Sequence, residues 1–142
     1  MKGIERFFVP LAYQGLKASE KEKELREIEK DVLGDILGIP DKTYKSMIRL
    51  GYIANISLGL VMDIFSCGML YNSYACFSKG DAQSGALSLL LGAGSRIFTG
   101  DHFYSTEKLL SKMKNTIEHF KEVNANFNKT KKRADESAQL LD

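Results

Sequence analysis

The sequence predicts an all-α protein built around a membrane-embedded two-helix hairpin, with amphipathic helical extensions at both ends. First, residues 50–95 contain only three charged side chains (Asp63, Lys79 and Asp81), whereas both flanks are rich in Lys and Glu. Second, this apolar block is broken once, by the turn-forming segment 77–81. Third, the amphipathic flanking helices offer too little apolar surface to cover such a hairpin. The hairpin therefore needs a bilayer or partner subunits.

Residues 1–18 are predicted to form an N-terminal interfacial arm. The aromatic side chains Phe7, Phe8 and Tyr13 alternate there with basic ones. Pro10 prevents one continuous helix, because proline has no backbone N–H and clashes with the preceding turn. Such a segment either lies as a foot on a membrane surface or packs as an ordinary N-terminal arm.

An amphipathic helix is predicted over residues 19–38. Ser19 and Glu22 have the spacing of a capping box, which favours a helix start at Ser19. The apolar residues that follow recur at helical steps, and the run Gly38-Ile39-Pro40 ends the helix.

The apolar helical hairpin is predicted over residues 41–99, with spans of about residues 50–77 and 82–98. The first span is long enough to cross a hydrocarbon core, and the second lies at the lower limit of length. Asn55 and Asp63 keep the first span below an unambiguous hydropathy signal. Both spans are rich in Gly and Ser, a composition that is unfavourable in soluble helices and common where membrane helices touch.

The hairpin places one acid and one base at nearly the same depth. Asp63 precedes Gly80 by 17 residues and Arg96 follows it by 16, so both lie about 24 to 26 Å from the turn. We expect an ion pair that fixes the register of the hairpin, so that a charge-swapped double variant recovers much of the stability that Asp63→Leu or Arg96→Leu loses. A conduction, proton-relay or gating role is the alternative. Small and polar residues share the helical faces of the pair, and the predicted helix–helix contacts are Asn55, Gly59, Ser66, Gly85, Ser88 and Gly92.

A heptad-like helix is predicted over residues 101–142. Asn124 occupies the first core position of the heptad pattern, and an Asn at this position sets the register of the helices in coiled coils. The helix pairs either with itself or with another subunit, or it packs on its own N-terminal helix. The predicted partner-helix contacts are Leu110, Met113, Ile117, Phe120, Asn124 and Phe127.

Charge and motifs limit the possible chemistry. A net charge of +2 is too small to indicate nucleic-acid binding. Cys67 and Cys76 are expected to be buried free thiols. His102 and His119 lack metal-ligand spacing, and no catalytic constellation is found, so we expect no enzyme, no cofactor and no metal.

The sequence therefore favours a non-enzymatic integral membrane protein that acts as an anchoring, scaffold or structural subunit of a larger membrane assembly. Its expected partners are a lipid bilayer and either other protein subunits or a second copy bound through the C-terminal helix. Basic residues before the first span and after the second predict that both termini face the cytoplasm or its equivalent. One alternative is a soluble helical bundle that forms an obligate oligomer through the hairpin. The other is a small pore or transporter subunit.

Overall fold

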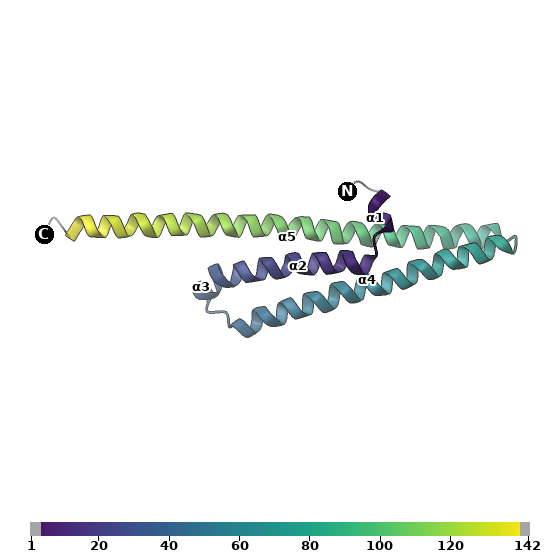
Figure 1. Ribbon diagram of the computed structural model, residues 1–142, viewed down its shortest axis with the longest axis horizontal. Helices are drawn as coiled ribbons and strands as arrows, with labels where there is room; N and C mark the ends of the chain where they lie inside the picture. Colours follow the sequence, from purple (N-terminus) through teal and green to yellow (C-terminus); the bar gives the residue numbers. More distant parts are fainter. Residues whose placement is uncertain (1–3, 140–142) are drawn as a thin grey trace.

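The computed structural model describes residues 4–139, and every regular element in this range is helical. The predicted all-α fold class is confirmed. The predicted segments 1–18 and 101–142 begin and end, respectively, outside the described residues. Figure 1 shows an elongated molecule, in which α4 (Asp41–Ser78) and α5 (Ala82–Gln139) meet at one end and α2 (Leu11–Glu29) lies beside them.

The N-terminal part consists of a short helix, α1 (Ile4–Phe8), followed by α2, and Pro10 separates the two as expected. The predicted helix start at Ser19 is wrong. Ser19 lies in the middle of α2 with only 1% of its surface exposed. Its hydroxyl lies within hydrogen-bond distance of the carbonyl oxygens of Gly15 in α2 and Gly51 in α4. The capping-box spacing was misleading because α2 is capped instead by a carboxylate from α4.

The connection from α2 to α4 contains a π-helical turn, η1 (Lys30–Gly34), and the short helix α3 (Asp35–Leu37). Gly38 follows with φ +63°, a left-handed conformation that favours glycine and ends helices. The chain then enters α4 after Pro40.

Helices α4 and α5 form an antiparallel hairpin. Its turn contains Gly80 with φ +82°, and Asp81 Oδ1 caps α5 by accepting the backbone N–H of Ser84 at 3.0 Å. The predicted division of the C-terminal half into separate helices is wrong, because α5 is continuous through Gly100. A Cβ atom at Gly100 would lie 3.3 Å from Gln14 Oε1, so the missing side chain serves close packing against α2 and does not break the helix.

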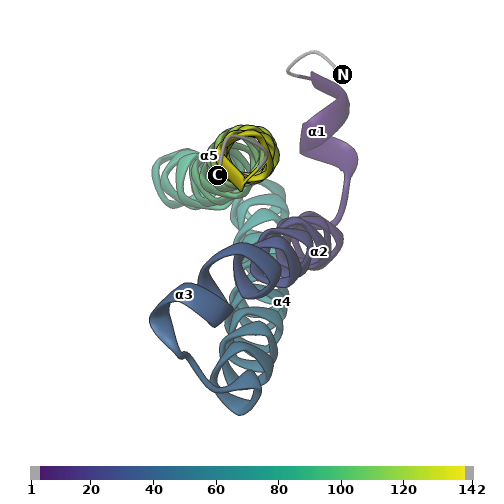
Figure 2. The same ribbon diagram turned by 90° about the vertical axis from the view of Figure 1, so that its left-hand side faces the viewer.

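The molecule has two parts, which we call the base and the tip. In the base, α2 packs against the first half of α4 and the middle of α5, and Figure 2 shows these three helices clustered with α1 to one side. The core of the base is small and includes Leu11, Ala18, Leu25 and Phe103, each no more than 1% exposed. The tip consists of residues 64–78 of α4, residues 82–95 of α5 and the turn between them. Figure 1 shows that it extends beyond the N-terminal end of α2.

Candidate functional site

Asp63 and Arg96 meet where the base joins the tip. Arg96 Nη1 lies 3.0 Å from Asp63 Oδ1, and the two side chains are 12% and 20% exposed, respectively. The structure therefore places the two residues in direct contact. Both are largely withdrawn from the surface, so each charge needs the other and further hydrogen bonds to offset its desolvation.

Those further bonds come from the chain between α1 and α2. The Asp63 carboxylate accepts the backbone N–H groups of Leu11 and Ala12, both at 3.0 Å. These N–H groups are the unpaired donors at the start of α2, where the helix dipole also favours an anion. Asp63 thus caps α2 from another helix, while Pro10 at the cap position provides no side-chain hydrogen bond.

Arg96 binds the carbonyl oxygens on the other side of the same linker. Its Nη2 donates to Val9 O at 2.9 Å, and its Nε donates to Phe7 O. We call Asp63, Arg96 and the backbone of residues 7–12 the junction clamp. The clamp joins α4, α5 and the N-terminal helices at one point. Sequence reasoning anticipated the pair but not the linker, because the linker takes part only through main-chain groups, which every residue possesses.

The contact between α4 and α5 in the tip is made by small and polar residues. Ser66 Oγ donates to Gly92 O at 2.9 Å, and Ser73 Oγ donates to Gly85 O at 2.8 Å. Asn72 Nδ2 donates to Ser88 Oγ at 2.8 Å. Ser66, Gly85, Ser88 and Gly92 therefore lie at the predicted contact. Asn72 and Ser73 were missed, although Ser73 continues the helical face of Ser66 at a spacing of seven residues.

The expectation that Asn55 and Gly59 face the second hairpin helix is wrong. Asn55 Nδ2 donates to Ser19 Oγ of α2 at 3.3 Å. A Cβ atom at Gly59 would lie 2.6 Å from Leu11 O, also in α2. The physical reason is that α2 occupies this face of α4 below Asp63.

The tip is apolar outside and polar inside. Its buried residues include Ser66, Ser73 and Ser88, each at most 7% exposed. Its outer surface includes Ile64, Tyr71 and Leu90, each more than 70% exposed. Residues 64–78 and 82–95 contain no Asp, Glu, Lys, Arg or His.

The two thiols are free, as expected, but they are not both buried. Cys67 is exposed on the outer surface of the tip and Cys76 is half-buried. The sequence predicts burial because both thiols fall inside the apolar block. In the structure, the outward face of α4 at Cys67 has no protein cover, which makes this thiol a native position for a probe.

The predicted partner contacts of the C-terminal helix fall into two groups. Leu110 and Ile117 are half-buried in the base, and their contact with a partner subunit stays a prediction. Between them, Lys114 Nζ pairs with Glu24 Oε2 of α2 at 3.1 Å. The segment therefore packs on its own N-terminal helix, the alternative considered above. The more exposed contacts are Met113, Phe120, Asn124 and Phe127.

The Glu24 carboxylate has two cationic neighbours. Hydrogen bonds from Lys21 and Lys114 lower the pKa of Glu24 below its usual range, and burial acts in the opposite direction. Lys114 belongs to α5 and Lys21 to α2. The ion pair therefore links the two helices at a partly exposed site, where such contacts contribute little to stability.

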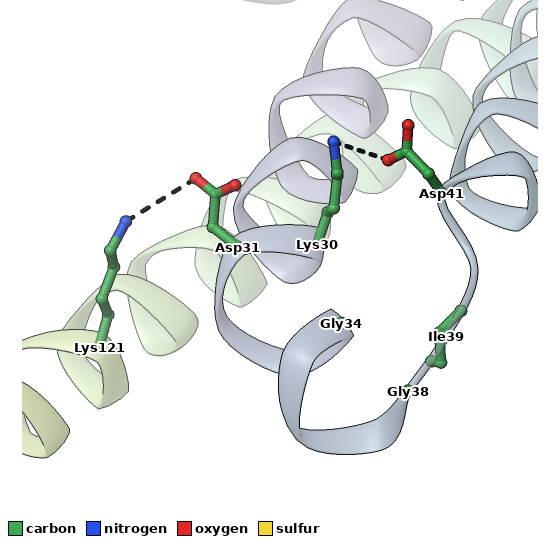
Figure 3. Close-up of a pocket in the computed structure, with 7 residues that line it drawn as sticks. All are labelled: Lys30, Asp31, Gly34, Gly38, Ile39, Asp41 and Lys121. Carbon is green, nitrogen blue, oxygen red and sulfur yellow. Dashed lines mark ion pairs between the residues drawn. The ribbon is translucent and has the colours of Figure 1, made fainter.

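A cavity of about 650 Å³ lies under the connection between α2 and α4 (Figure 3). Lys30 Nζ pairs with Asp41 Oδ1 at 2.6 Å, and Lys121 Nζ lies 3.8 Å from Asp31 Oδ2. These pairs attach α4 and α5 to η1. The lining holds two cations and two carboxylates, so it has no net charge that would select an ionic ligand.

A comparison with models of protein families, with curated proteins and with solved structures finds no match. Within residues 4–139, no group of three or more His, Cys, Asp and Glu side chains is arranged to hold a metal ion.

Proposed function

We propose that this protein is an integral membrane protein whose tip is embedded in a lipid bilayer. The tip would anchor the base and the exposed C-terminal part of α5, residues 122–137, which we call the arm, as a structural subunit of a membrane assembly. The observation that carries the proposal is the reversed polarity of the tip. In water, a two-helix unit with serines inside and leucines outside would lose the hydrophobic contribution that normally stabilises a fold. In lipid, apolar side chains face outward and small residues mediate helix contacts.

Helix α4 supports this proposal by its length and exposure. It is long and apolar enough to cross a membrane, and it is the one helix among the described residues that meets this criterion. The core helix of a soluble protein meets the same criterion, but such a helix is mostly buried. Only 11% of the most apolar stretch of α4 is buried. A signal sequence also meets it, but α4 begins 40 residues into this chain, at Asp41.

The apolar surface of α5 continues from the tip past Arg96 to Phe98, and its length is close to the thickness of a bilayer. Phe98, which is 77% exposed, is 18 residues from Gly80, or about 27 Å along the helix. The hydrocarbon core of a bilayer is about 30 Å thick. Arg96 comes before Phe98, but its charge is paired with Asp63 in the junction clamp. The next charged residue of α5 is the exposed Asp101, which lies where the hydrocarbon would end.

A hairpin inserted in this way leaves the base and the arm on the same side of the membrane. The basic residues that flank the hairpin favour the cytoplasmic side, or its equivalent, for both. The second function to consider is an obligate soluble oligomer. Both α4 and α5 expose apolar side chains, so a single partner copy would cover only part of this surface and leave the rest in water. This is the argument against the soluble oligomer. A pore role is less favoured, because the polar atoms of Asp63 and Arg96 are occupied within the clamp.

Membrane fractionation with a matched pair of variants tests the proposal. Leu90 lies ten residues from Gly80, about 15 Å from the turn and so near the middle of a bilayer. Lysine at the centre of a membrane helix costs about 2.5 to 3.5 kcal/mol on insertion scales. We therefore expect Leu90→Lys to move much of the protein out of the carbonate-resistant membrane fraction. Val123→Lys is the control: it introduces the same charge in the arm, where Val123 is 51% exposed. It should leave the share of protein in the carbonate-resistant membrane fraction unchanged.

Release of the unaltered protein by carbonate, followed by its recovery as a detergent-free oligomer, would establish the soluble alternative instead. Equal retention of both variants would show that the tip does not contact lipid.

A further inference from the structure

An apolar stripe on α5, beyond the tip, is left exposed by the described part of the chain. We call it the outer stripe, and its members are Leu109, Met113, Phe120, Val123 and Phe127, each 40% to 64% exposed. Together with the exposed Thr116 and Thr130, they follow one another at alternating steps of four and three residues. This spacing is typical of a helix that pairs with another helix along one face.

The proposed bilayer does not cover the outer stripe either. Leu109, its member nearest the membrane, is 29 residues from Gly80, or about 44 Å along α5. If the turn lies at the far surface of a hydrocarbon core about 30 Å thick, the stripe begins beyond the headgroups on the near side. Figure 1 shows that the arm extends past the ends of the other helices. Burial of the stripe therefore requires a partner outside the membrane.

The charges beside the outer stripe indicate which kind of partner fits it. When the stripe is taken as the core of a heptad pattern, the flanking positions include Lys112, His119, Lys131 and Arg133 and contain no acid. In the described part of the chain, none of these four side chains forms an ion pair.

The nearest acidic residues cannot offset these cations. By the 3.6-residue period, Glu118 and Glu122 fall on the far side of the helix from the outer stripe. A second copy of this chain would bring the same cations to the contact and no acid. A helix with acidic flanks would instead form ion pairs with the unpaired lysines on both edges of the stripe.

We infer that the outer stripe binds an acidic amphipathic helix of another protein subunit, whose apolar face packs on Phe120, Val123 and Phe127. The inference rests on the proposed function and deepens it, because it names the kind of partner through which the anchored protein joins an assembly. A matching helix has apolar residues at heptad spacing and Glu or Asp at the flanking positions. The apolar contact provides affinity, and the opposite charges determine which helix binds.

Calorimetric titration of the full chain in mild detergent tests the inference with two synthetic peptides. Both are heptad helices with leucine at the core positions, and they differ only in having glutamate or lysine at the flanking positions. We expect the glutamate peptide to bind at least about tenfold more tightly than the lysine peptide. Phe127→Ser should weaken binding of the glutamate peptide by about tenfold, because it removes one aromatic side chain from the contact.

Two neighbouring lysines provide a matched pair of variants for the charge argument. Lys131 flanks the outer stripe, whereas Lys132 lies on another face, because consecutive residues are about 100° apart around a helix. Lys131→Glu should weaken binding of the glutamate peptide by about fivefold, since an attraction becomes a repulsion. Lys132→Glu should weaken it by less than about twofold.

Equal binding of the two peptides, equal effects of Lys131→Glu and Lys132→Glu, or no binding of the glutamate peptide would overturn the inference. Sedimentation of the full chain alone tests the other occupant. Self-association that Phe127→Ser abolishes would overturn the acidic partner and identify a second copy as the occupant. The proposed membrane function is judged separately by carbonate extraction, in which Phe127→Ser should behave like the unaltered protein.

Discussion

Exchanging the charges of Asp63 and Arg96 tests how the junction clamp stabilises the fold. A simple ion pair tolerates exchange of its two charges, so the double variant Asp63→Arg/Arg96→Asp should recover stability. In the structure, Asp63 also accepts two backbone N–H groups and Arg96 also donates to two backbone carbonyls. An arginine at position 63 cannot accept those N–H groups, and an aspartate at position 96 cannot donate to those carbonyls. The exchanged pair is therefore expected to remain unstable.

The magnitude follows from what each change leaves unpaired. Asp63→Leu removes the partner of a largely buried Arg96, a kind of change that costs about 3 to 5 kcal/mol. It also removes the cap of α2, and loss of a cap costs about 1 kcal/mol. Arg96→Leu should cost a similar amount, because it strands the carboxylate. We expect the charge-swapped protein to recover less than about 1 kcal/mol relative to the less stable single variant.

The assay is denaturant unfolding of the full chain in mild detergent, followed by helical circular dichroism. Asp101→Asn is the matched control, because Asp101 is an exposed carboxylate of α5 one turn beyond Arg96, and it should change stability by less than about 0.5 kcal/mol. A charge-swapped protein as stable as the unaltered one would refute the role of the backbone contacts. The pair would then be the simple register device that the sequence suggested.

Three further predictions concern the base and the arm. Gly59→Ala should destabilise the protein by about 1 to 3 kcal/mol, because its Cβ would lie 2.6 Å from Leu11 O. Gly68→Ala, with open space around it in the same helix, should be neutral or stabilising in the same unfolding assay, and equal effects would contradict the packing of α2 on α4. Glu24→Gln should destabilise the protein at neutral pH but not in acid. Because the pKa of Glu24 is lowered in the folded protein, the carboxylate stabilises the fold above the ordinary Glu pKa of about 4.3. This stabilisation is lost as the pH falls through the lowered pKa. If the difference in free energy of unfolding between the Glu24→Gln and unaltered proteins did not depend on pH, the ion pairs would be contradicted. Removing residues 122–142 should change the free energy of unfolding by less than about 0.5 kcal/mol, because residues 122–137 are exposed throughout. A larger loss would show that the arm stabilises the base.

The sequence predicted those parts of the fold that depend on local pattern. The charge-poor block and the glycine at position 80 indicated the hairpin, because a turn between two apolar helices needs a residue that tolerates positive φ. Equal distance from Gly80 was sufficient to pair Asp63 with Arg96. Small residues at helical spacing indicated the α4–α5 contact near Ser66.

What the sequence did not predict depends on contacts between segments that are remote in sequence. The start of α2 carries no side-chain cap of its own, so Ser19, a good capping residue within the helix, gave a misleading signal. Gly100 resembled a helix break because its use in close packing depends on Gln14, which is remote in sequence. The sequence left two partners open for Leu110 and Ile117, because a helix presents the same apolar pattern to its own chain as to another subunit.

The most direct test of the account measures the depth of native Cys67, after Cys76→Ser, with a nitroxide spin label in lipid vesicles. An embedded tip predicts that the label collides readily with dissolved oxygen and rarely with a water-soluble nickel complex. A label at position 129, which is exposed in the arm, should show the opposite behaviour. Ready collision of the nickel complex with the Cys67 label would contradict the account, because the outer surface of the tip would then face water.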